Sequence, residues 1–118
     1  MKVHEYSLMQ SLLEMINEEI KTHPSCKLHA FTIKVGALSG IEPELMKTAF
    51  EILKPGTPAE HAIMNIKYVP LICWCEDCLN KYTVEDLNFE CPKCKGSKIK
   101  VLQGDDTILE SIELEEME

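Results

Sequence analysis

The chain has 118 residues, of which 45% are hydrophobic, and its formal net charge at pH 7 is −8. This length supports one ordinary domain, or a small core together with a metal-stabilised module. No apolar run approaches the roughly 20 residues of a membrane-spanning helix, and no apolar signal segment precedes the chain, so we expect a cytoplasmic protein with no membrane partner.

The first predicted element is an amphipathic helix that begins near Ser7 and ends before Pro24. Ser7 and Gln10 resemble a capping box, which places His4 and Glu5 just ahead of the first turn. Apolar residues then recur every four positions, as on one face of a helix: Leu8, Leu12, Ile16 and Ile20.

The next elements alternate between strand and helix. Residues 28–35 show the period of a half-buried strand, which Gly36 and the Ser39-Gly40 pair end. Pro43 suits the first turn of a second helix, which stops at residues 54–56. A second strand is predicted from Ala62 to about Leu71, running directly into a cluster of cysteines.

Five of the six cysteines lie between Cys73 and Cys94. Two C-x-x-C pairs, Cys75 with Cys78 and Cys91 with Cys94, are separated by twelve residues, which is the ligand pattern of a tetrahedral zinc site. Disulfides are the alternative, but a reducing cytosol favours metal. Cys73 is left over as a free thiol that could still compete for the ion. Four thiolates close the coordination shell, so the pattern indicates a structural zinc rather than a catalytic one.

The remaining residues complete the fold prediction. Ile99 and Val101 alternate with lysines as in a short strand, and a third main-sheet strand follows with Ile108, Ile112 and Leu114 on the face opposite Leu109. We expect an α+β fold with two helices on one face of a three-stranded, mainly antiparallel sheet and an inserted four-cysteine zinc-ribbon module. The predicted domains are residues 1–70 with 105–118, and residues 71–104.

Charge argues against a nucleic acid partner. Residues 73–100 hold five lysines and five acidic residues, whereas residues 105–118 hold seven acidic residues and no lysine. A zinc ribbon that grips nucleic acid needs a basic surface, because phosphate neutralisation dominates such binding. The second hypothesis is a zinc-ribbon interaction module on a transcription or RNA-processing partner. It predicts a basic surface, so the charge count weighs against it, and we expect no nucleic acid.

No catalytic constellation is present in the sequence. It has no glycine-rich phosphate loop and no nucleophile elbow, so we expect that the protein is not an enzyme. A thiol-disulfide enzyme is a third hypothesis, which would need a thiol of low pKa outside the zinc shell, and Cys73 is its natural candidate.

His4-Glu5 is a second place where chemistry could lie. Imidazole suits nickel, and an N-terminal amine with nearby backbone amides can complete a square-planar set of nitrogen ligands. The dipeptide alone favours the plainer interpretation, a solvated histidine beside an acid that stabilises a helix N-terminus. The other histidines have no ligand-spaced partner in the sequence: His23, His29 and His61.

Four blocks of sequence, taken together, resemble a known family. They are residues 4–8 (His-Glu-Tyr-Ser-Leu), residues 35–44 (Val-Gly-Ala-Leu-Ser-Gly-Ile-Glu-Pro-Glu), residues 56–60 (Gly-Thr-Pro-Ala-Glu), and the two C-x-x-C pairs. In this order they cover nearly the whole chain and are similar to the HypA/HybF family of hydrogenase nickel-incorporation proteins.

The resemblance implies a nickel metallochaperone for the maturation of [NiFe] hydrogenase. Such a protein carries Ni²⁺ as weakly bound cargo and Zn²⁺ as a structural ion. Its implied partners are a nickel-handling GTPase, the hydrogenase large subunit and, in some bacteria, urease maturation proteins. The residues carried over are His4 and Glu5 for nickel, and Cys75, Cys78, Cys91 and Cys94 for zinc.

The amino terminus departs from the family pattern. The family begins Met-His-Glu, whereas Met1-Lys2-Val3 moves the histidine two positions inward to His4. Either Val3 corresponds to an alternative start, or the longer terminus is real and the backbone nitrogens that bind nickel differ.

Overall fold

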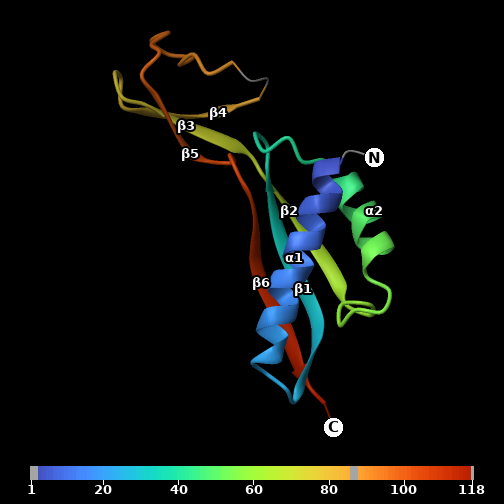
Figure 1. Ribbon diagram of the computed structural model, residues 1–118. Coiled ribbons are helices and arrows are strands. Elements are labelled where there is room, and N and C mark those ends of the chain that lie inside the picture. The colour runs from blue at the N-terminus through green and yellow to red at the C-terminus, as the bar shows by residue number, and fades with distance from the viewer. Residues whose placement is uncertain (1–2, 86–87, 118) are drawn as a thin grey trace.

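The computed structural model describes residues 3–85 and 88–117 (Figure 1). Met1 and Lys2, on which the choice of terminal nickel ligands depends, lie outside the described residues. The elements, in chain order, are α1 (Val3–Lys21), β1 (Cys26–Gly36), α2 (Pro43–Leu53), β2 (Ile63–Val69), β3 (Leu71–Cys75), β4 (Asn80–Val84), β5 (Ile99–Gln103) and β6 (Thr107–Glu116). Neither helix has the length and apolarity that crossing a bilayer would require.

The strands form two separate sheets, with the orders β2-β1-β6 and β4-β3-β5. Strand β1 pairs parallel with β2 and antiparallel with β6, and β3 pairs antiparallel with both of its neighbours. The parallel pair arises because α2 crosses over between β1 and β2, as a parallel connection requires. The expected α+β fold with mainly antiparallel pairing is confirmed, and the molecule is elongated, with extents of 59 × 29 × 17 Å.

Both helices bury their apolar sides against one face of the β2-β1-β6 sheet. Their core includes Phe31 of β1 and Phe50 of α2, which meet edge to face with ring centroids 5.3 Å apart. The opposite face is charged, since Lys34 and Lys67 lie 3.1 Å and 2.7 Å from the Glu110 carboxylate. Hydrogen bonds from Lys67 and then Lys34 hold the pKa of Glu110 below its ordinary value.

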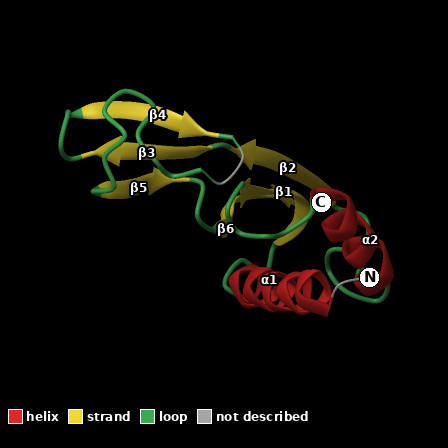
Figure 2. Ribbon diagram, turned by 90° about the horizontal axis from the view of Figure 1, so that it is seen from above, coloured by secondary structure: helices red, strands yellow, loops and turns green. Residues whose placement is uncertain are grey.

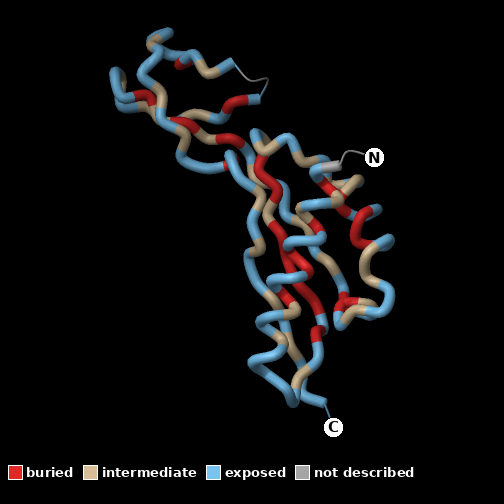
Figure 3. Tube along the Cα trace, viewed as in Figure 1, coloured by how far each residue is buried: buried red, intermediate tan, exposed pale blue. Residues whose placement is uncertain are grey.

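The second sheet has a small core of its own. Its buried members are Leu71, Cys73 and Val84. Figure 3 shows buried segments in both sheets, and Figure 2 shows the second sheet extending to one side, away from both helices. The predicted division into two domains, residues 1–70 with 105–118 and residues 71–104, requires two cores. That division stays a prediction.

Helix α1 begins at Val3, so the prediction of a start near Ser7 was wrong. His4 and Glu5 lie in the first turn rather than ahead of it. The early start has a tertiary cause, because Tyr6 packs against the main core and the His4 ring contacts the loop that follows β1. Such contacts stabilise helical turns that local capping signals do not predict.

The predicted strand from residue 62 to residue 71 is two strands. Pro70 separates β2 from β3, and the two belong to different sheets. Proline has no backbone N–H for a ladder, so the strand is interrupted there. Strand β4 was not predicted, whereas the second helix at Pro43 and the strand at Ile99 were.

Strand β6 contains a bulge that changes which residues face the core. Thr32 pairs with Ser111 but Ile33 pairs with Leu109, which leaves Glu110 as the extra residue. Leu109 therefore packs on the core together with Ile112 and Leu114, whereas Ile108 is 49% exposed. The predicted grouping of Ile108 with the core residues was wrong, because a bulge shifts the two-residue period by one position.

The two sheets meet at a junction of closely approaching backbone. The Gly36 N–H donates to the Asp106 carbonyl at 2.9 Å, and Leu38 N–H donates to the Gly104 carbonyl at 2.8 Å. A Cβ on Gly36 would lie 2.5 Å from the Gly104 carbonyl oxygen, and one on Gly104 would lie 2.5 Å from that of Pro70. Neither position has room for a side chain, so the crossing strands are held at a fixed separation.

Candidate functional site

Four cysteine side chains converge at the outer end of the second sheet. Cys75 ends β3, Cys78 follows in the next turn, and Cys91 and Cys94 come from the loop before β5. The sulfur atoms all lie within 4.8 Å of one another, with Cys75 to Cys94 at 3.5 Å and Cys78 to Cys91 at 3.6 Å. A tetrahedral metal with bonds of about 2.3 Å would space its sulfur ligands about 3.8 Å apart. The geometry therefore fits one metal ion.

Two tight turns aim these sulfurs inward. Each pair is followed by a residue in the left-handed region, Leu79 at φ 55° and Lys95 at φ 63°. The Gly96 N–H donates to the Cys94 sulfur at 3.3 Å. The pKa of Cys91 is lowered to about 6, first by the backbone N–H of Cys94, a donor of the kind that stabilises thiolate over thiol.

We expect Leu79→Gly to raise the free energy of unfolding of the metal-loaded protein by about 1 kcal/mol, because a Cβ disfavours the left-handed conformation. Leu79 is 69% exposed, so little apolar contact would be lost. Denaturant titration measures the change. Leu102→Gly is the control, since Leu102 is 47% exposed in an ordinary strand and glycine should destabilise there. Destabilisation by both changes would contradict the strain argument.

Cys73 is not one of the four converging cysteines. It is fully buried in the core of the second sheet, and burial raises the pKa of its thiol. A redox-active cysteine needs access to solvent and a lowered pKa. The structure therefore disfavours a thiol-disulfide role for Cys73.

His4 and Glu5 form a second unusual pair, in the first turn of α1. The His4 side chain is 56% exposed, and its Nε2 lies 2.7 Å from Glu5 Oε2 and 3.3 Å from the Gly40 carbonyl oxygen. Glu5 is fully buried, and within the part of the chain that the structure describes neither carboxylate oxygen has a hydrogen-bond partner of good geometry. A buried carboxylate whose close polar contact is one histidine ring, and which accepts no hydrogen bond, is costly, so its presence requires an explanation such as a bound ion.

The loop between β1 and α2 passes beside the first turn of α1 (Figure 1), where the Gly40 carbonyl oxygen contacts the His4 ring. Gly40 has a φ of +75°, and the adjacent Ser39 hydroxyl accepts a hydrogen bond from Thr107 at 2.9 Å and donates to the Gly36 carbonyl at 2.7 Å. Ala37 N–H donates to the Val69 carbonyl at 2.9 Å. The site around His4 therefore adjoins the junction of the two sheets. Sequence reasoning missed this proximity, although residues 35–44 form one of the four blocks that resemble the family.

The other histidines lie apart from this site. His23 Nδ1 lies 3.2 Å from the Glu19 carbonyl oxygen, His29 pairs with Glu115 at 3.8 Å, and His61 pairs with Glu60 at 3.4 Å. Over residues 3–85 and 88–117, the four cysteines are the one group of three or more metal-binding side chains close enough to share an ion.

The sequence matches a family model over residues 3–114, and that model is described as hydrogenase/urease nickel incorporation, metallochaperone, hypA. A hydrogenase maturation factor HypA of Shewanella baltica is 33% identical over 98% of this chain and 99% of its own. A hydrogenase maturation factor HybF of Escherichia coli O157:H7 is 36% identical over 96% of this chain and 100% of its own.

Solved structures agree in fold. The solution structure of the Ni metallochaperone HypA from Helicobacter pylori is 26% identical, with a TM-score of 0.67 over 93% of this chain and 96% of its own. A second solution structure, of a HypA protein, is also 26% identical, with a TM-score of 0.72 over 97% and 98% of the two chains.

Proposed function

Because this chain belongs to the HypA family of nickel-incorporation metallochaperones, we propose that it delivers Ni²⁺ to the large subunit of a [NiFe] hydrogenase together with a nickel-handling GTPase. Its relatives are named hydrogenase maturation factors, and we propose that this chain acts as a carrier rather than as an enzyme. The family description also includes urease, so urease maturation proteins are proposed as further partners.

We propose His4 and Glu5 as nickel ligands, and the buried Glu5 carboxylate is the observation that supports this most. A carboxylate with neither solvent nor hydrogen bonds gains more from a cation than an exposed one does, because the surroundings screen the attraction less. The adjacent imidazole is exposed, so the cargo can enter and leave from the solvent side.

The contacts of the ring indicate which nitrogen would bind the metal. Nε2 lies 2.7 Å from Glu5 Oε2, so it is the ring nitrogen that could share one ion with that carboxylate. We propose that Nε2 and Glu5 Oε2 bind nickel as neighbouring ligands, beside the Gly40 carbonyl oxygen of the β1–α2 loop. Backbone nitrogens near the terminus would complete the ligand set.

We propose zinc as the ion of the four-cysteine site, with Cys75, Cys78, Cys91 and Cys94 as ligands. Four thiolates suit zinc and leave no open coordination position, so the ion would serve structure. Nickel is the cargo in this proposal and is assigned to the nitrogen and oxygen ligands at the other site.

His4→Ala tests the nickel site directly. We expect the affinity of the zinc-loaded protein for nickel to fall by at least about tenfold in a nickel titration that is monitored by calorimetry and absorption spectroscopy. His29→Ala is the matched control, since His29 is also a half-exposed histidine beside a carboxylate, and it should bind as the unchanged protein does. Equal nickel binding by all three proteins would rule out His4 as a ligand.

A further inference from the structure

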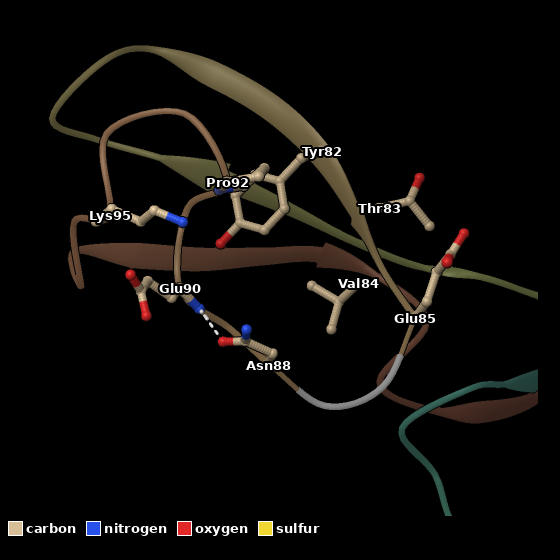
Figure 4. A pocket seen from close by; sticks show the side chains of 8 residues that line it. All are labelled: Tyr82, Thr83, Val84, Glu85, Asn88, Glu90, Pro92 and Lys95. Atoms are coloured by element: carbon tan, nitrogen blue, oxygen red, sulfur yellow. Dashed lines mark hydrogen bonds between the residues drawn. The ribbon is translucent and has the colours of Figure 1, made fainter.

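The second sheet has one covered face and one open face. Tyr82 and Val84 pack in its core together with Phe89 of the loop before β5. Figure 4 shows Tyr82 and Val84 pointing toward that loop, whereas Thr83 between them points away. The residues that alternate with the core positions therefore lie on a second face, which the loop does not cover.

A row of three side chains crosses this open face. Trp74 of β3 pairs with Lys81 of β4 on one side and with Lys100 of β5 on the other. Trp74 is half-buried but does not belong to the core cluster, and both lysines are exposed. We call Trp74, Lys81, Lys100 and the neighbouring pair Ile72 and Thr83 the tryptophan face.

The tryptophan face carries positive charge that is not paired with acidic side chains. Lys81 and Lys100 have no acidic partner within ion-pair distance among residues 3–85 and 88–117. The lysines on the main sheet and helices, in contrast, largely pair with glutamates. Lys81 and Lys100 therefore give this face two unpaired positive charges beside the Trp74 ring, although the chain as a whole is acidic.

We infer that the tryptophan face docks an acidic, extended segment of a partner protein. One apolar side chain of that segment would lie on the Trp74 ring, and carboxylates on either side would pair with Lys81 and Lys100. Tryptophan is the residue type most often central to binding energy, and flanking charges set approach rate and specificity. This docking role goes beyond nickel carriage and does not depend on it.

Charge decides between a protein and a nucleic acid as the occupant. Tight nucleic acid binding is supplied by many phosphate contacts, whereas this face offers two lysines beside the ring. A net charge of −8 would also repel a long polyanion more than a short acidic segment.

Selection from a random peptide library against the zinc-loaded full chain tests the inference. We expect the enriched peptides to be acidic and to carry an aromatic or aliphatic residue between the acids. Trp74 is the only tryptophan, so its fluorescence should shift on titration with an enriched peptide. The double variant Lys81→Glu with Lys100→Glu should weaken binding by about tenfold or more, and added salt should weaken it too.

The control is Lys21→Glu with Lys47→Glu, which reverses two exposed lysines on the helices and should leave the affinity unchanged. Circular dichroism and zinc content confirm that each variant is folded. The inference is wrong if the enriched peptides carry no acidic excess, or if the two double variants weaken binding equally. It is also wrong if a mixed-sequence single-stranded oligonucleotide binds this face more tightly than the peptide, or if a second copy of this chain occupies it in sedimentation.

Discussion

Removing the proposed zinc ion from the four-cysteine site is expected to unfold the β4-β3-β5 sheet while the β2-β1-β6 sheet stays folded. Within the described part of the chain, the buried hydrophobic cluster of the second sheet consists of Leu71, Cys73 and Val84, too few to hold the sheet without the metal. Structural zinc sites contribute about 10–16 kcal/mol of binding free energy, which becomes folding free energy when the site exists only in the folded state. The main sheet has its own larger core and shares none of the four ligands.

Hydrogen exchange with and without a zinc chelator measures this effect residue by residue. Protection should be lost in β3, β4 and β5 and kept in β1. Cys78→Ser should reproduce the loss without chelator. Cys26→Ser is the matched control, because Cys26 lies in β1 outside the four-cysteine group. Retained protection throughout the zinc-free second sheet would show that its fold does not depend on the metal.

Glu5→Met is expected to stabilise the nickel-free protein and to weaken nickel binding in the same molecule. Methionine fills nearly the same volume and removes two buried oxygens without hydrogen-bond partners, at the loss of one contact with the half-exposed His4 ring, which should raise the free energy of unfolding by about 1–3 kcal/mol. Loss of the carboxylate should lower nickel affinity by about 10- to 100-fold. Functional sites commonly cost stability in this way.

Thermal unfolding without nickel and calorimetric nickel titration measure the two effects. Glu14→Met is the matched control, since Glu14 is an exposed glutamate of the same helix and its replacement should change stability by no more than about 0.5 kcal/mol. A destabilised Glu5→Met protein would show that the carboxylate has a structural partner, and unchanged nickel affinity would remove Glu5 from the proposed ligand set.

The four-cysteine site could be predicted from sequence because its geometry is local. Cys75 and Cys78 are held by one turn, and so are Cys91 and Cys94, so spacing alone specifies how the sulfurs point. The surroundings of His4 could not be predicted, because Gly40 lies 36 residues away and reaches the ring through the β1–α2 loop. The burial of Glu5 depends on the same tertiary packing and leaves no trace in the local sequence.

The misassigned elements have equally specific causes. The capping pattern at Ser7 predicted too late a start for α1, because tertiary contacts of the preceding turn extend the helix to Val3. The apolar residues on both sides of Pro70 suggested one continuous strand, although the proline separates β2 from β3. Strand β4 did have a signal, since Tyr82 and Val84 alternate with Lys81 and Thr83. The bulge at Glu110 could not be foreseen, because it shows only in the pairing with β1.

The junction between the sheets also determines when the proposed cargo site can form as the chain is made. The Gly40 loop is fixed by Val69, Gly104 and Thr107, and Thr107 follows Ser39 by 68 residues. His4 is synthesised before Thr107, so the loop beside the histidine is fastened only after β6 has been made. We therefore expect a chain without β6 to lack an ordered loop beside His4, so that the proposed nickel site forms only once β6 is in place.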